Sequence, residues 1–254
     1  MRILISNDDG ISAAGINALI DLLCTEHEVY VAAPMLQKSA SSHALTMQHP
    51  ITVMEMNDPR AVKSWAVGGN PADCTKLALE ELLGFAPDWV ISGINHGPNL
   101  GTDLLYSGTV AAAAEGTLFN IPSIAISSLD ASLEQLGEVM KAVKEALNWL
   151  FKHPVGGHTL LNINIPAMPY DAMKGMKITR IGVARYDKPF SKRIDPRGNT
   201  YYWLAGDLVL ESESEEADVI AARDGYISIS PVRFAFDDWE THRKLSQQLE
   251  QGSV

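Results

Sequence analysis

Short apolar runs alternate with amphipathic segments along most of this chain, and this alternation constrains the fold more than any other feature. The runs that we expect to form strands are residues 3–5, 29–33, 89–94, 123–127 and 160–165. The segments with helical spacing of apolar residues are 15–23, 70–83, 107–119 and 131–151. Strand–helix alternation is typical of a parallel sheet covered by helices on both faces. The sequence therefore predicts an α/β protein with a Rossmann-like three-layer core and a mostly parallel sheet.

Two segments in the first third add detail to this pattern. Residues 51–56 and 62–67 flank a proline-containing turn at 57–59, and we expect them to pair as antiparallel strands. Asn70 followed by Pro71 is a helix-start signal, because asparagine caps the free N–H groups and proline suits the first turn.

The chain has 254 residues, which is enough for one large α/β domain. Since 46% of the residues are apolar, a full core can form without disulfides or structural metal. We expect a single domain over 1–254, with residues 1–170 as the core. The composition changes after about residue 170, so residues 171–254 are expected to form a protruding arm, a late strand that returns to the sheet at 225–231 and a terminal helix at 237–250.

The charge and the termini narrow the choice of partners. A net charge of −11 argues against a polyanionic partner such as DNA or RNA. Only three apolar residues follow Arg2, which is not a signal-peptide layout, and no run approaches the roughly 20 apolar residues that span a bilayer. Cys24 and Cys74 are isolated, and we expect both to be reduced, buried thiols. We therefore expect a cytoplasmic protein with no membrane partner.

Two adjacent carboxylates, Asp8 and Asp9, follow the first expected strand. In a parallel sheet this turn lies at the carboxyl edge, where ligands bind. The two charges repel each other, and a divalent cation between them relieves the repulsion. The alternative is that both residues serve only in the turn and in capping the next helix. The pair alone does not decide between these interpretations.

Two further polar loops should reach the same edge of the sheet. Asn95 follows the strand at 89–94, and an amide oxygen suits a hard cation, although asparagine is also favoured in turns because it tolerates left-handed geometry. The loop at 37–43 offers three hydroxyls, among which spacing does not choose, and it also reads as a flexible serine-rich loop. These hydroxyls belong to Ser39, Ser41 and Ser42.

Ser107, Gly108 and Thr109 open an alanine-rich helix. The free N–H groups and the positive dipole end of such a helix bind phosphate readily, whereas ordinary capping by Ser107 needs no ligand. Combined with an acidic pair and neutral oxygens, this helix start indicates metal-assisted hydrolysis of a phosphate ester, with Mg²⁺, Mn²⁺ or Ca²⁺ as the cation.

Other nucleotide and hydrolase signatures are absent from the sequence. There is no GxGxxG after the first strand, no GxxxxGK[ST] and no GxSxG. The seven histidines show no HExxH pattern, which argues against zinc. His43 and His96 lie in the candidate loops, where either can contact a substrate, although a histidine in such a loop is more often simply solvated.

Four segments together resemble SurE, the survival-protein family of nucleotidases. They are residues 5–10 (ISNDDG), 91–99 (ISGINHGPN), 106–113 (YSGTVAAA) and 195–198 (DPRG) followed by Tyr202-Trp203, in the order of the family. The resemblance implies a metal-dependent phosphatase that acts on nucleoside 5′- and 3′-monophosphates and, additionally, on short polyphosphate. It also implies homodimers or homotetramers with exchanged C-terminal arms, which residues 180–250 would supply here.

The resemblance also implies roles for single residues. By motif, the metal ligands fall on Asp8, Asp9, Ser39 and Asn95, with both aspartates catalytic. The phosphate contacts fall on Asn95, Ser107, Gly108 and Thr109. At Ser39 the chain departs from the family, because Ala40 stands where relatives commonly carry glycine.

Two other phosphate chemistries are weighed against this one. A Mg²⁺-binding phosphoacceptor switch domain without turnover also carries an acidic pair, but it needs an aspartate and a lysine at later strand ends, where this chain has Asn95 and Ser127-Ser128. An aspartyl-nucleophile phosphatase of the haloacid dehalogenase type needs two aspartates separated by one residue, whereas Asp8 and Asp9 are adjacent.

Overall fold

The computed structural model describes residues 1–130, 132, 134–187, 190–205, 207–210, 214–234 and 238–251. A nine-stranded sheet forms its centre, in the order β3-β4-β2-β1-β5-β6-β7-β13-β8. These strands are β1 (Arg2–Ser6), β2 (Glu28–Pro34), β3 (Val53–Met56), β4 (Lys63–Val67), β5 (Trp89–His96), β6 (Ser123–Ser128), β7 (Leu160–Ile165), β8 (Met176–Ile178) and β13 (Ile227–Val232).

The six strands from β4 to β7 along this sheet are parallel to one another. β3 is antiparallel to β4, as the sequence predicts for that pair. The late strand β13 returns antiparallel to β7, and the short strand β8 extends the sheet beyond it. The mostly parallel α/β architecture expected from the sequence is confirmed; β8 was not among the expected strands.

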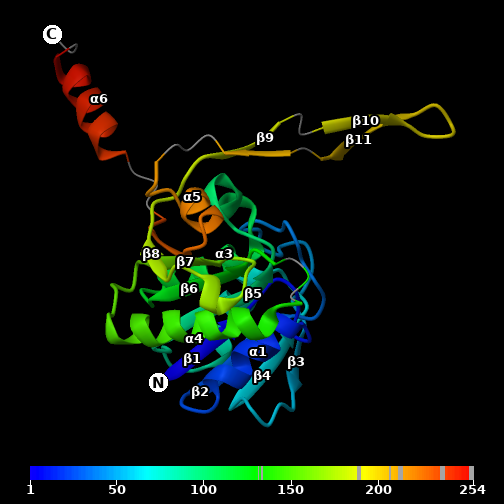
Figure 1. Cartoon of the computed structure of the whole chain (residues 1–254), viewed down its shortest axis with the longest axis vertical. Coiled ribbons are helices and arrows are strands. Elements are labelled where there is room, and N and C mark those ends of the chain that lie inside the picture. The colour runs from blue at the N-terminus through cyan, green and yellow to red at the C-terminus, as the bar shows by residue number, and fades with distance from the viewer. Residues whose placement is uncertain are drawn as a thin grey trace.

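Helices cover both faces of the sheet (Figure 1). On one side Ile16 of the first helix packs with Ile3 and Ile5 of β1. On the other side Cys74 packs with Leu4 of the same strand. Because β1 is covered on both faces, its residues form a continuous apolar run instead of alternating with polar ones. The helices are α1 (Ala14–Leu23) and α4 (Leu136–Lys152) on the first face, and α2 (Pro71–Leu77) and α3 (Gly108–Leu118) on the second.

Two helix starts illustrate what local sequence decides. The predicted cap at Asn70 is present, since Asn70 and Asp73 form a reciprocal capping box ahead of α2. By contrast, α4 begins at Leu136 instead of residue 131. The carboxylate of Asp130 accepts hydrogen bonds from the N–H groups of Ser132 (3.1 Å) and Gln135 (3.0 Å), so these residues form a turn before the helix. Ala131 and Leu133 lie outside the described residues.

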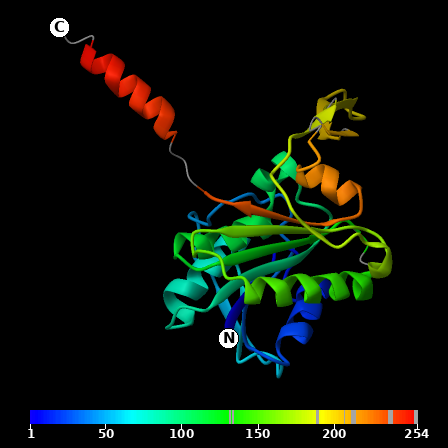
Figure 2. The same cartoon turned by 60° about the vertical axis from the view of Figure 1, so that its left-hand side comes forward.

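Two antiparallel strand pairs, β9 (Ala184–Asp187) with β12 (Asp207–Leu210) and β10 (Phe190–Ile194) with β11 (Thr200–Leu204), extend away from the sheet (Figure 1). The chain then returns to the sheet at β13, and the terminal helix stands apart from the body (Figure 2). Within the part of the chain that the structure describes, every helix is too short or too polar to cross a bilayer. The other elements that follow β8 in the chain, apart from β13, are α5 (Asp218–Arg223) and α6 (Trp239–Gln251).

Candidate active site

The turn that carries the acidic pair is held by Asn7. The side chain of Asn7 is fully buried, donates to the carbonyl of Gly10 (2.9 Å) and accepts from its N–H (3.2 Å). The backbone N–H of Lys38 donates to the carbonyl of Asp8 (2.7 Å), which joins this turn to the loop after β2. The ends of β1 and β2 therefore lie side by side, as the parallel register of the two strands requires.

Asp8 is packed against the start of α3. Only 5% of Asp8 is exposed, and its Oδ1 accepts a hydrogen bond from the hydroxyl of Thr109. A Cβ atom on Gly108 would lie 2.8 Å from the Cβ of Asp8 and 2.7 Å from the Oγ of Ser41, so only glycine permits this approach. Burial raises the pKa of Asp8 to about 6, opposed by the Thr109 hydrogen bond and assisted by the negative charge of Asp9.

Asp9 joins two other strand ends. Its side chain is 6% exposed. Its Oδ1 accepts from the Nε2 of Gln37 (3.1 Å), and the same nitrogen donates to the Oγ of Ser39 (3.0 Å). Its Oδ2 accepts from the backbone N–H of His96 (3.4 Å), and the His96 ring nitrogen lies 3.9 Å away. Ser39 and the end of β5 are thus both brought beside Asp9.

Asn95 is delivered to this edge by an irregularity in β5. The pairing of β5 with β6 shifts register between Ser92 and Asn95. Gly93 adopts a φ of +141° there, and a Cβ at that position would lie 2.5 Å from the carbonyl oxygen of Ile126. The Asn95 side chain then donates its amide nitrogen to the carbonyl of Gly97 (2.8 Å), so the amide oxygen is the atom that can serve as a ligand.

The structure distinguishes the three serines that sequence spacing left equivalent. Ser39 lies beside Asp9 through Gln37. The Oγ of Ser41 is buried near Gly108, with no hydrogen-bond partner in the described chain. Ser42 has a structural role, because its hydroxyl donates to the carbonyl of Leu105 (2.8 Å).

Ser107 caps α3 in the ordinary way, since its Oγ accepts from the N–H of Val110 (3.1 Å). The predicted capping interpretation is therefore correct. It leaves the earlier N–H groups of the helix directed at the edge where Asp8 lies.

Sequence reasoning missed two polar residues near this edge, Gln37 and Glu115. Gln37 gave no signal beyond loop composition. Glu115 did give a signal in the sequence, because it is the single charged residue of the segment 107–119. In the structure its Oε1 lies 2.6 Å from the Nε2 of His43. A lone carboxylate on an otherwise apolar helix needs a buried partner.

The chemistry of these donors suits a hard divalent cation. Two buried carboxylates are adjacent, and among the described residues no lysine or arginine nitrogen pairs with either of them. The described chain also holds no group of three or more His, Cys, Asp or Glu side chains that can bind a metal. A cation here would therefore rely on Asp8 and Asp9 together with the neutral oxygens of Ser39 and Asn95, a hard-oxygen set.

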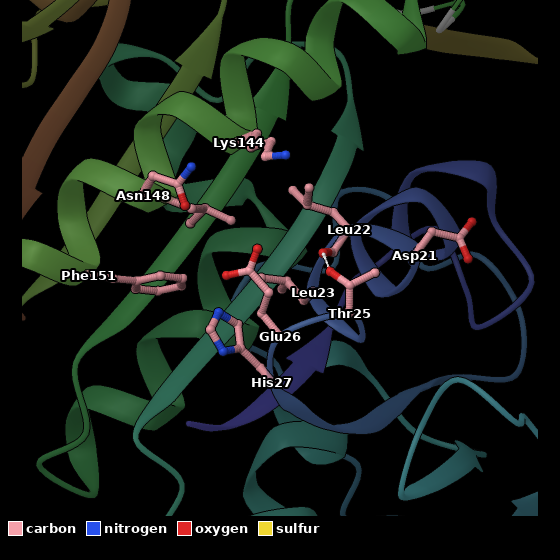
Figure 3. A pocket seen from close by; sticks show the side chains of 10 residues that line it. Asp21, Leu22, Leu23, Thr25, Glu26, His27, Lys144, Asn148 and Phe151 are labelled. Carbon is pink, nitrogen blue, oxygen red and sulfur yellow. Dashed lines mark hydrogen bonds between the residues drawn. The ribbon is translucent and has the colours of Figure 1, made fainter.

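A separate cavity of about 180 Å³ lies between α1 and α4 (Figure 3). His27, Lys144 and Phe151 are among the residues that line it. Since His27 directly precedes β2, this cavity is at the amino ends of the strands, away from Asp8 and Asp9. We therefore place the candidate active site at the carboxyl edge and not in this cavity.

Known proteins are similar to this chain over nearly its whole length. A family model described as "Survival protein SurE" matches residues 3–188. The chain is 47% identical to the 5′-nucleotidase SurE of Pelotomaculum thermopropionicum, covering 100% of this chain and 97% of that protein. It is 45% identical to the 5′-nucleotidase SurE of Syntrophomonas wolfei, covering 98% and 96%. The crystal structure of the SurE protein from Aquifex aeolicus superposes with a TM-score of 0.85 at 34% identity, covering 98% of this chain and 99% of that one.

Proposed function

This chain belongs to the SurE family, and from that premise we propose that it is a 5′-nucleotidase, a hydrolase that releases phosphate from nucleoside monophosphates. The observation that carries the proposal is the packing of Asp8 against the first turn of α3. An acidic pair for a cation and a helix start for a phosphate are thereby adjacent, which is what phosphomonoester hydrolysis requires.

SurE nucleotidases are metal-dependent, and in this chain we propose Asp8, Asp9, Ser39 and Asn95 as the ligands of Mg²⁺ or Mn²⁺. When bound, such a cation supplies Lewis-acid polarisation of the phosphate ester. Gln37 supports this set by orienting Asp9 and Ser39 from one amide nitrogen.

Phosphate oxygens are proposed to bind at the start of α3 and to the amide of Asn95. The backbone N–H groups of Gly108 and Thr109, with Ser107, offer donors at the positive end of the helix dipole. The buried hydroxyl of Ser41 is a further donor that has no protein partner in the described chain. One of the two carboxylates, Asp8 or Asp9, takes part in the attack on phosphorus. It accepts a proton from the attacking water while the P–O bond to the nucleoside breaks, or it attacks phosphorus itself and displaces the nucleoside oxygen, and water then hydrolyses the acyl phosphate.

The proposed substrates are nucleoside 5′- and 3′-monophosphates and, in addition, short polyphosphate. A phosphoacceptor switch without turnover is not favoured, because the relatives are nucleotidases and the strand ends at Asn95 and Ser127-Ser128 carry neither the aspartate nor the lysine that such a switch needs.

We propose that the chain assembles into a homodimer or homotetramer through residues 180–250, and that it works in the cytoplasm. Several apolar side chains of the arm and α6 face solvent in the single chain, which is costly unless another copy covers them. The most exposed are Phe190 (65%), Ile194 (66%), Leu204 (77%) and Leu249 (75%). Both cysteines are free thiols, which suits a reducing compartment; Cys74 is buried as expected, whereas Cys24 is only partly buried because it lies just after the end of α1.

The test is phosphate release from a panel of nucleoside 5′- and 3′-monophosphates and short polyphosphate, each with EDTA, Mg²⁺ or Mn²⁺. We expect turnover of monophosphates with added metal and none with EDTA. Stable transfer of phosphate to the protein from a small phosphodonor, without turnover, would instead support the switch.

A further inference from the structure

A hydrogen bond between a histidine and a buried glutamate links α3 to the serine loop, defined as residues 37–43. The Oε1 of Glu115 lies 2.6 Å from the Nε2 of His43. Glu115 comes from the middle of α3 and is 2% exposed, whereas the side chain of His43 is 34% exposed at the end of the serine loop. The two residues are 72 positions apart in the sequence, so this contact is purely tertiary.

Burial makes this contact costly to break. The second carboxylate oxygen of Glu115, Oε2, is buried with no hydrogen-bond partner among the described residues. His43 is therefore the partner on which the buried carboxylate depends, and a buried carboxylate without a partner is strongly disfavoured. The imidazole is also held by Phe234, whose ring meets it edge-on at 6.3 Å between centroids.

The position of the serine loop bears on the candidate active site. Lys38 donates its backbone N–H to Asp8 at the start of the loop (2.7 Å), and Ser39 shares the Gln37 amide with Asp9. Near its end, Ser42 donates its N–H to the carbonyl of Tyr106 (3.1 Å), just before α3. His43 then anchors the loop to α3 itself.

We infer that His43 and Glu115 are positioning residues that lock the serine loop onto α3 and so set the distance between the Ser39 hydroxyl and the phosphate-binding helix start. The inference rests on the proposed function of this edge. Neither residue touches the reacting atoms; each acts through the loop. Loss of the lock lets the loop open, which weakens metal binding and leaves the helix start intact.

Limited trypsin proteolysis measures how readily the serine loop opens, and it does not depend on the enzymatic activity of the protein. Lys38 is exposed within the loop, and cleavage after it requires local opening. Mass spectrometry follows the rate of cleavage after Lys38 in the metal-free protein. We expect His43→Ala to increase this rate about tenfold, because the variant loses one hydrogen bond to a carboxylate. His43→Gln, which retains a donor for Glu115, should restore most of the protection.

A second variant removes the other partner. Glu115→Leu keeps a similar volume and takes away the buried carboxylate, so it should accelerate cleavage as His43→Ala does. The double variant should be cleaved no faster than either single variant, because both changes break one contact. His49→Ala is the matched control, since His49 is exposed and its ring lies 3.3 Å from the carbonyl oxygen of the adjacent Pro50, away from the contact between His43 and Glu115.

Steady-state kinetics separates positioning from general damage. We expect the Mn²⁺ concentration for half-maximal activity to rise about tenfold in His43→Ala, while kcat at saturating Mn²⁺ stays close to wild type. A structural defect alone would lower kcat without changing the Mn²⁺ dependence. Unchanged cleavage after Lys38, or effects that multiply in the double variant, would overturn the inference even if the protein is an active nucleotidase. If the protein shows no nucleotidase activity but the variants are cleaved faster after Lys38, only the proposed function is refuted and the inference about His43 and Glu115 stands.

Discussion

Thr109, in the first turn of α3, donates its hydroxyl to the Oδ1 of Asp8 at the end of β1, across 101 residues of sequence. This single contact places the positive end of a helix against one of two adjacent carboxylates. The hydrogen bond favours the charged form of Asp8 and so partly offsets the burial that raises the pKa of this carboxyl to about 6.

Thr109→Val removes that hydroxyl and keeps the shape of a side chain that is fully buried. We expect the metal-free protein to lose about 1–3 kcal/mol of unfolding free energy near neutral pH, because a buried carboxylate oxygen loses its donor. Urea unfolding in EDTA measures the loss. Thr109→Ser keeps the hydroxyl and removes one buried methyl group, which by itself costs about 1 kcal/mol. A valine variant as stable as wild type would show that the contact contributes nothing.

Asp8→Asn tests the proposed catalytic role. We expect kcat to fall by at least on the order of 10²-fold, because a ligand carboxylate and its charge are lost from the site. The fold should be retained, since asparagine is nearly isosteric with aspartate. Asp171→Asn, at an exposed carboxylate away from the site, is the matched control and should keep wild-type turnover of nucleoside monophosphates. Near-normal phosphate release by Asp8→Asn would exclude Asp8 from the reaction.

The pH dependence of metal-free stability follows from the raised pKa of Asp8, which is about 6 in the folded protein against 3.8 for the ordinary group. Between these values the folded state holds a proton that the unfolded state releases, so stability falls as the pH rises through this window. The shift corresponds to about 3 kcal/mol. Urea unfolding of the wild type and of Asp8→Asn in EDTA, from pH 4.5 to 7, measures it. If both proteins respond identically to pH, burial does not disfavour the Asp8 charge.

The parts of this molecule that were predictable from sequence are those that local chemistry decides. Apolar runs such as residues 3–5 mark strands buried on both faces, and the Asn70-Pro71 signal marks the start of α2. The α4 start was misplaced because the carboxylate of Asp130 captures backbone N–H groups that a helix pattern would have used. A turn of that kind leaves no trace in apolar periodicity.

The candidate site shows the same division. The loops that carry Asp8 and Asn95 were predicted to share one edge, because parallel strands fix which ends meet. The pairing of His43 with Glu115 and the choice among the loop serines depend on contacts between distant segments. Nothing in the spacing of one chain specifies such contacts, so only the folded structure reveals which hydroxyl lies beside Asp9.

Gly108→Ala separates close packing at the helix start from helix stability. The new Cβ would lie 2.8 Å from the Cβ of Asp8 and 2.7 Å from the Oγ of Ser41, so α3 must shift away from the acidic pair. We expect a fall in kcat/KM of at least about tenfold, since misplacement of the order of 1 Å is costly in a preorganised site. Phosphate release at saturating Mn²⁺ measures it.

Gly137→Ala is the matched control for that substitution. Gly137 lies in the first turn of α4, and among the described residues no atom outside its own stretch of helix lies within 4 Å of the position that a Cβ would take, so alanine fits there. It should raise the unfolding free energy by about 0.5–1 kcal/mol through helix propensity and leave phosphate release unchanged. If Gly108→Ala behaved like Gly137→Ala, gaining stability and keeping full turnover, the contact between α3 and Asp8 would be irrelevant to the reaction. The proposed phosphate site at the start of α3 would then have to be abandoned.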